Sequence, residues 1–188
     1  MLDGPAENVF PLSFRLATSG DAAAICDLVN ASYRGAAGGW THEADWVAGP
    51  RTSLVELSGL LVHTDTAFMV AIGGGRIVAC MRLEKDGTDV QLGMFAVEPA
   101  LQGQGIGKRL LAEAERHAWR AMGAQRLVMT VISQRHELVA FYERRGYRRL
   151  GDVSDYPSHW NVGMPRRAGL TIERLAKWSV AAEATGGE

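Results

Sequence analysis

The sequence predicts a single α+β domain in which helices cover both faces of a central mixed sheet. Two apolar runs, Ala67–Ile72 and Arg76–Glu84, flank Gly73-Gly74-Gly75, a pattern typical of an antiparallel hairpin. A strand over 89–97, a glycine-rich loop, a helix over 106–122 and a strand over 126–132 then form a β-α-β unit, whose strands lie parallel. A sheet that contains both kinds of neighbour is mixed.

The remaining elements follow from hydrophobic spacing. A first strand is expected near 14–17 and helices over 21–33 and 53–61. After the β-α-β unit, a short helix over 136–146 ends at Gly146 and a strand begins at 147–150. We expect 151–168 to be irregular and 169–178 to form the last strand. The domain then covers 13–178, with a flexible arm over 1–12 and a disordered tail over 179–188.

Composition narrows the functional classes. The chain has 188 residues, a formal net charge of -1 and 47% hydrophobic residues, as expected for an ordinary globular protein. There is no basic excess for a nucleic-acid partner, no apolar run long enough for a membrane span and no signal-peptide pattern, so we expect a cytoplasmic protein. Cys26 and Cys80 are interpreted as free thiols, and the histidines show no metal-ligand spacing, so we expect no metal.

The loop "EPALQGQGIGKRLL" raises a question about its helix. Lys108 and Arg109 lie where the helix dipole is positive, and no Ser, Thr, Asp or Asn caps the helix. A bound anion would solve both problems, because an uncapped helix start offers backbone N–H groups and glycines allow a close approach. The alternative is a solvated glycine-rich turn, which explains one glycine but not three.

Two nucleotide motifs fit this loop poorly. A P-loop requires glycine at 102 and Ser or Thr at 109, where the chain has Gln102 and Arg109. The dinucleotide fingerprint that starts at Gly103 and Gly105 requires a third glycine at 108, where the chain has Lys108.

A third pattern, Gln/Arg-x-x-Gly-x-Gly/Ala after a strand that ends near Val-x-Pro, is matched by Gln102, Gly105 and Gly107. Together with "AFYERRGYR" further along, it resembles the GNAT-type N-acetyltransferase superfamily over about 67–150. The resemblance implies the acyl-CoA N-acyltransferase fold, with a sheet splayed between 95–97 and 129–132. It also implies acetyl-CoA as co-substrate, with its pyrophosphate on the loop. The implied cofactor-binding residues are Phe95, Ala96, Val97, Gln102, Gly103, Gln104, Gly105, Ile106, Gly107, Lys108 and Arg109.

The second motif supplies a candidate catalytic residue. By resemblance, Tyr142 is the general acid that protonates the leaving thiolate, although its helical position alone would fit a core tyrosine. Arg135 stands where the family commonly has Asn, so a cofactor contact at 135 stays open. The general base also stays open: Gln91 cannot serve as a base, and Glu84, Glu43 and His42 are candidates without a geometric argument. Gly93 inside its strand indicates a bulge or a close approach of another segment.

The acceptor site is expected near the loop between the first two helices. Tyr33, Arg34, Trp40 and Glu43 combine aromatic surface with both charge signs, as suits a small polar ligand, while a flexible loop with Trp40 and Trp46 in the core is the alternative. Residues 153–161 are a second candidate wall.

We expect direct acetyl transfer to a primary amine of a small molecule within a ternary complex, with no nucleic-acid or membrane partner; a homodimer stays open. The alternatives are a non-catalytic acyl-CoA-binding sensor and an enzyme that acetylates a protein amine.

Overall fold

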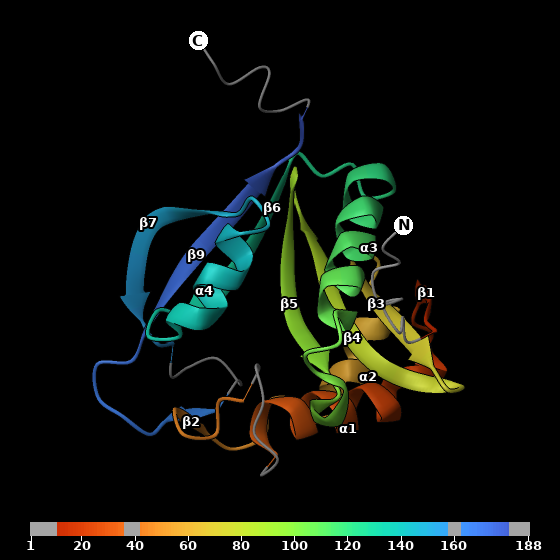
Figure 1. The fold of residues 1–188 in the computed structure, drawn as a ribbon, viewed down its shortest axis with the longest axis horizontal. Coiled ribbons are helices and arrows are strands. Elements are labelled where there is room, and N and C mark those ends of the chain that lie inside the picture. Colours follow the sequence, from red (N-terminus) through yellow and green to blue (C-terminus); the bar gives the residue numbers. More distant parts are fainter. Residues whose placement is uncertain (1–10, 36–41, 158–162, 181–188) are drawn as a thin grey trace, which may run out of the picture.

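The computed structural model describes residues 11–35, 42–157 and 163–180. In these ranges the main sheet has seven strands in the order β1-β3-β4-β5-β6-β9-β7 (Figure 1). Only the β5–β6 pair among them is parallel, so the predicted mixed sheet is confirmed. The strands are β1 (Ser13–Leu16), β3 (Thr66–Gly73), β4 (Arg76–Asp86), β5 (Asp89–Val97), β6 (Arg126–Ile132), β7 (Arg148–Asp155) and β9 (Thr171–Trp178).

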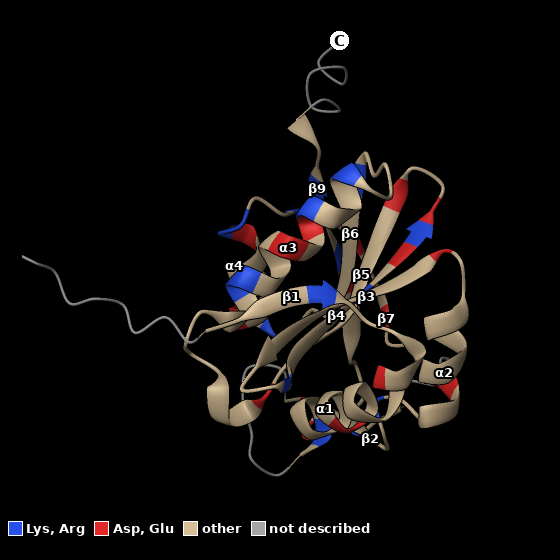
Figure 2. Ribbon diagram, turned by 90° about the vertical axis from the view of Figure 1, so that its right-hand side faces the viewer, with Lys and Arg blue, Asp and Glu red and all other residues tan. Residues whose placement is uncertain are grey.

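Helices cover both faces of this sheet, as Figure 2 shows. On one face, α3 (Ile106–Arg120) and α4 (His136–Glu143) pack on a core that includes Met81, Leu83 and Leu92. On the other face, α1 (Ala22–Arg34) and α2 (Leu54–Val62) cover Cys80 and Met94. Successive strand residues therefore enter different cores, which explains why β4 and β5 are apolar at both alternating sets of positions. No helix within the described ranges has the length and apolar character needed to cross a membrane.

The sheet opens between β5 and β6. Their parallel pairing stops at Leu92 and Met129, and beyond this pair the two strands diverge (Figure 1). A bulge in β5 accompanies the divergence: the register with β4 shifts between Cys80 and Arg82, and Met94 has a φ of 45°. The expected splay between 95–97 and 129–132 is therefore confirmed. The bulge that Gly93 indicated is centred on the next residue.

The prediction of an irregular segment over 151–168 is wrong in part. β7 continues to Asp155 along β9, and β8 (Met164–Pro165) pairs with β2 (Val47–Ala48) in a second small sheet. β7 lies at the edge of the main sheet and most of its residues are exposed, so it lacks the apolar alternation that identifies a strand from sequence. The two-residue strands β2 and β8 are too short for any periodicity to show.

Candidate active site

Two cavities lie at the opening of the sheet. We call the first the loop cavity: it holds about 330 Å³ and lies between the start of α3, the end of β5 and α4. The second, the polar cavity, holds about 380 Å³ and is lined by β4, β5, β6 and the segments around α1 and α2. Phe95 and Leu138 line both cavities. The two spaces therefore meet where β5 leaves β6.

The loop that precedes α3 has an anion-binding geometry. Gly103 and Gly105 have φ angles of 79° and 77°, and a Cβ at either position would meet open space. Backbone conformation therefore explains why these two residues are glycines. The Arg109 N–H donates to Gly105 O at 3.1 Å, which begins the helical ladder. The N–H groups before Arg109 in this first turn have no acceptor within the helix, and they lie at the wall of the loop cavity.

Gly107 and Gln102 position this loop against β5. A Cβ on Gly107 would lie 3.2 Å from Phe95 Cζ, so any larger residue would require Phe95 or the start of α3 to shift. The Gln102 side chain donates from Nε2 to Val97 O at 2.9 Å and joins the loop to the end of β5. The motif residues therefore have two roles. Gly103 and Gly105 shape the loop backbone, whereas Gln102 and Gly107 hold the loop against β5.

Most of the expected cofactor-binding residues line the loop cavity, and three do not. Ala96 is buried in the core under α1 and α2, Gln104 is not part of the wall, and the Arg109 guanidinium lies 5.5 Å from the ring centroid of Phe14. Those that line it are Phe95, Val97, Gln102, Gly103, Gly105, Ile106, Gly107 and Lys108.

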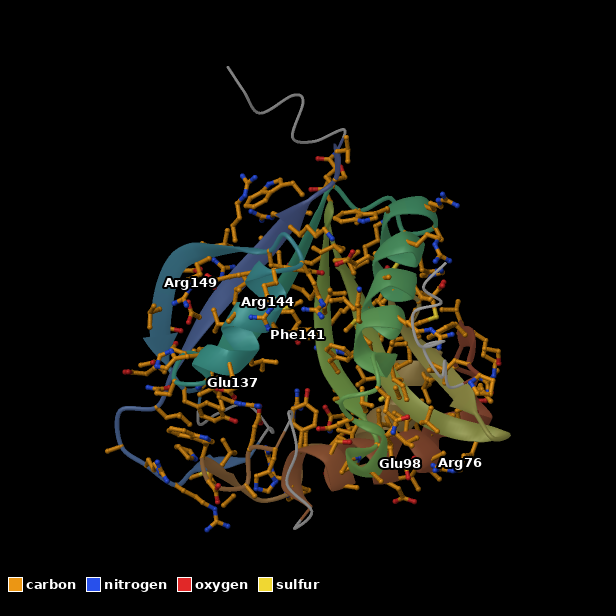
Figure 3. All side chains as sticks on the ribbon, in the orientation of Figure 1. Arg76, Glu98, Glu137, Phe141, Arg144 and Arg149 are labelled. Carbon is orange, nitrogen blue, oxygen red and sulfur yellow. The ribbon has the colours of Figure 1, made fainter. Side chains whose placement is uncertain are left out.

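Sequence reasoning missed the wall that α4 provides. Leu101, Leu138, Phe141, Arg144 and Arg145 also line the loop cavity. Phe141 extends from α4 toward β5 (Figure 3), and the Arg145 guanidinium lies 3.4 Å from the centroid of its ring. The basic turn in "AFYERRGYR" was the signal that could have identified Arg144 and Arg145, since an anion site gathers cations.

Tyr142 lines the polar cavity close to the junction with the loop cavity. Its ring contacts Phe95 and Tyr147, with centroids 6.5 Å and 5.8 Å away, which fixes its orientation. Burial raises the pKa of Tyr142 well above its ordinary value, so the hydroxyl stays protonated at neutral pH. The side chain is 5% exposed and forms part of the cavity wall, so a ligand in the polar cavity can reach it.

The residues expected at the acceptor site have different positions. Tyr33 and Glu43 line the polar cavity, and the Tyr33 hydroxyl donates to Phe95 O at 3.2 Å. Arg34 does not belong to the wall; it donates to Glu43 at 3.0 Å and holds that carboxylate in place. Trp40 lies outside the described residues. From the second candidate wall, Tyr156 and Pro157 line the cavity.

Four polar residues bear on the questions that the sequence left open. Arg135 lines the polar cavity and not the loop cavity, and it lies 3.6 Å from Glu43 and 3.3 Å from Glu137. Of the candidate bases, Glu43 and Glu84 line the polar cavity and His42 does not. Each of the two carboxylates already contacts an arginine.

Neither described cysteine is placed to carry an acyl group. Cys80 is fully buried in the core, and burial raises the pKa of its thiol to about 12. Cys26 lies on α1, and neither thiol lines the loop cavity or the polar cavity.

The chain is similar to acetyltransferases in sequence and in structure. An IAA acetyltransferase of Azospirillum brasilense is 29% identical over 98 residues, which span 51% of this chain and 63% of that protein. The ribosomal-protein-S18-alanine N-acetyltransferase of Escherichia coli is 17% identical with a TM-score of 0.66, over 89% of this chain and 94% of that one. PaiA N-acetyltransferase of Thermoplasma acidophilum, solved in complex with coenzyme A, is 19% identical with a TM-score of 0.64, over 90% and 99%.

At these identities the solved structures establish a shared fold. A model of the Acetyltransferase (GNAT) family matches residues 22–147, which include both cavities' central strands, the glycine loop and Tyr142. The fold, the loop and this match agree, and the chain belongs to the GNAT acetyltransferase family.

Proposed function

We propose that the protein transfers an acetyl group from acetyl-CoA directly to a primary amine of a small molecule. One observation carries this proposal: two cavities that share Phe95 and Leu138 meet beside a buried, protonated tyrosine. Such an arrangement lets a donor and an acceptor enter from different sides and react where the sides join.

The loop cavity suits the donor. The N–H groups at the start of α3 and the cations Lys108, Arg144 and Arg145 suit a diphosphate. The gap beyond Leu92 and Met129 leaves room for an extended amide chain to pair with the β5 backbone. A thioester at the end of that chain would lie near Phe95 and Leu138, at the junction of the cavities.

The chemistry then needs three events at this junction. The neutral amine attacks the thioester carbon, and its electron pair forms the new C–N bond. The tetrahedral intermediate collapses, the C–S bond breaks and the sulfur leaves with the electron pair. The Tyr142 hydroxyl can donate its proton to that sulfur, and it regains a proton that the new amide nitrogen releases. Neither described thiol lines either cavity, which fits direct transfer without an acyl-enzyme intermediate.

The polar cavity favours a small acceptor. Its volume of about 380 Å³ falls in the range of small-molecule pockets. Side chains from separate segments close the cavity on several sides.

The test is thiol release from acetyl-CoA across a panel of small amines, with peptides that present a free N-terminus or a lysine as a second arm. We expect turnover with small amines in the wild type and a large loss in Tyr142→Phe. Tight acetyl-CoA binding with no turnover on any amine would show a sensor instead. Turnover confined to peptides would show a protein acetyltransferase.

A further inference from the structure

Two arginines lie in the polar cavity on the side away from the glycine loop. Arg51 precedes α2, and Arg82 lies on β4; both line the cavity that Tyr142 also lines. Neither residue has a role in holding the donor, because neither lines the loop cavity.

The Arg51 guanidinium has no anionic partner in the described part of the chain. Its Nη1 atom is buried without a hydrogen-bond partner among these residues. The guanidinium lies over the face of the Tyr33 ring, whose centroid is 5.4 Å from Cζ. A cation–π contact offsets only part of the cost of removing a guanidinium from water.

The Arg82 guanidinium is only partly satisfied. Nη1 lies 3.1 Å from Glu84, whereas Nε is buried with no partner among the described residues. Burial lowers the pKa of Arg82 and repulsion from Arg51 adds to this, so the two positive charges act on each other.

Gly93 makes room for Arg82. The two residues face each other across the β4–β5 pair, and a Cβ on Gly93 would lie 3.4 Å from Arg82 Nη2. The absence of a side chain on β5 therefore keeps the Arg82 guanidinium against the strand, at the cavity wall.

The other acidic groups of this cavity have their own partners. Glu43 contacts Arg34 and Arg135, and Glu56 accepts a hydrogen bond from Thr52 Oγ1 at 2.9 Å. Glu84 contacts Arg82 alone among the described arginines. A positive charge at Arg51 is thus left over in a partly buried space, where an uncompensated charge is costly unless a ligand supplies the counter-charge.

We propose that the acceptor is an amine that also carries a carboxylate, as an amino acid does, and that Arg51 and Arg82 bind this carboxylate. The inference rests on the proposed function and names its substrate class. Guanidinium groups bind a carboxylate through paired N–H donors, and the unused Arg51 Nη1 and Arg82 Nε supply donors of this kind. A polyamine would bring further positive charge to the arginines and is disfavoured.

The test compares amines in matched pairs that differ only by the carboxylate. Suitable pairs are histidine with histamine, tryptophan with tryptamine, and phenylalanine with phenethylamine, each assayed with saturating acetyl-CoA. We expect the carboxylate to raise kcat/KM at least about tenfold for the preferred side chain, as a charge-assisted contact does. Equal or lower kcat/KM for every carboxylate-bearing member would overturn the inference while leaving an acetyltransferase.

Variants locate the effect. Arg51→Met and Arg82→Met should each lower kcat/KM about tenfold more for the carboxylate-bearing amine than for its decarboxylated partner. Arg51→Met should fold well, since it leaves no carboxylate without a partner. Arg174→Met is the matched control: Arg174 is also a strand arginine with an acidic partner, Asp152, but it lines neither cavity. An unchanged preference in both cavity variants would contradict the assignment.

A binding measurement separates the two proposals. Histidine and histamine are titrated into protein saturated with coenzyme A. Tighter binding of histidine that Arg51→Met abolishes supports the carboxylate site even if no amine is acetylated, which would refute the proposed function alone. Equal binding of both compounds refutes the carboxylate site.

Discussion

The loop cavity and the polar cavity are built in different ways from the same sheet. The loop cavity takes most of its wall from one continuous segment, 101–108, whose backbone conformation and packing create the site. The polar cavity takes side chains from α1, the segment before α2, β4, β5, β6 and the segment after β7. A backbone site in one segment leaves a motif in the sequence, whereas a side-chain site assembled from many segments does not.

This difference also predicts how each site tolerates change. The loop cavity depends on glycines at fixed backbone conformations, so single substitutions there should be severe. The polar cavity depends on side chains that can be exchanged one at a time without disturbing the sheet. The same donor site can therefore serve acceptor sites of different chemistry. The following experiments test this contrast, from the largest expected effect to the smallest.

Gly105→Glu should weaken acetyl-CoA binding by about a hundredfold or more, because it places a negative charge where the donor's diphosphate is expected. Isothermal titration calorimetry measures the affinity. Gly74→Glu is the control, since Gly74 also has a positive φ, 58°, with open space at Cβ, but lies in the β3–β4 turn. Equal affinity for the Gly105 variant and the wild type would contradict the loop assignment.

Tyr142→Phe should lower kcat about a hundredfold and leave the affinity for acetyl-CoA nearly unchanged, as loss of a general acid does. Steady-state kinetics with the best amine provides the measurement. Tyr147→Phe is the control: its buried hydroxyl donates to Glu115 at 2.9 Å and lines neither cavity, so it should cost about 1 kcal/mol of stability and little activity. Similar losses of kcat in both variants would point to a packing role for Tyr142.

Two alanine substitutions in β5 and α3 should separate the cavities. Gly107→Ala pushes against Phe95 and should weaken acetyl-CoA binding about fivefold. Gly93→Ala places a Cβ 3.4 Å from the flexible end of Arg82, which is an ordinary contact, and should raise the KM of the amine by a smaller factor. Each should leave the other ligand unaffected. If each substitution changed both the acetyl-CoA affinity and the KM of the amine, the two cavities would not bind their ligands independently.

Stability should decline in alkaline solution. Burial raises the pKa of Tyr33 and of Cys80 to about 12, so the folded protein retains protons that the unfolded chain releases at lower pH. The contribution is complete below about pH 8 and is lost as the pH rises toward 12. We expect the free energy of unfolding to fall by about 1 kcal/mol or more between pH 9 and pH 11, measured by urea denaturation. A Tyr33→Phe variant should lose less than the wild type over this range.

Most of the fold could be predicted from the sequence, because the core strands and helices show clear hydrophobic periodicity and turn residues. The apolar runs of β3, β4 and β5 and the stripe of α3 identify themselves through period and turn residues, and the β-α-β rule gives their directions. The second half of β7, beyond residue 150, escaped prediction because its residues are exposed and it pairs with β9, a separate segment of the chain. Its strand conformation comes from tertiary pairing and not from its own composition.

The site residues show the same contrast between features with a local sequence signal and features that depend on tertiary structure. The glycines of the loop were found because Gly103 and Gly105 satisfy a backbone need that few residues can meet. Arg51, Arg82 and Gly93 could not be combined into a site from the sequence, because only the β4–β5 register brings Arg82 and Gly93 together. Arg135 shows the limit of transferring positions from a family, since its side chain turns toward Glu43 and the polar cavity.

The short contact between β5 and β6 has a mechanical consequence. In the described residues their ladder runs only from Asp89 and Arg126 to Leu92 and Met129, so the two halves of the sheet share a brief seam. A molecule bound in the gap between β5 and β6 contacts both halves of the sheet and should restrict their movement relative to each other. We expect coenzyme A to raise the melting temperature and to slow amide exchange in β6 and β9 as well as in the glycine loop. The donor would then be part of what makes the enzyme rigid.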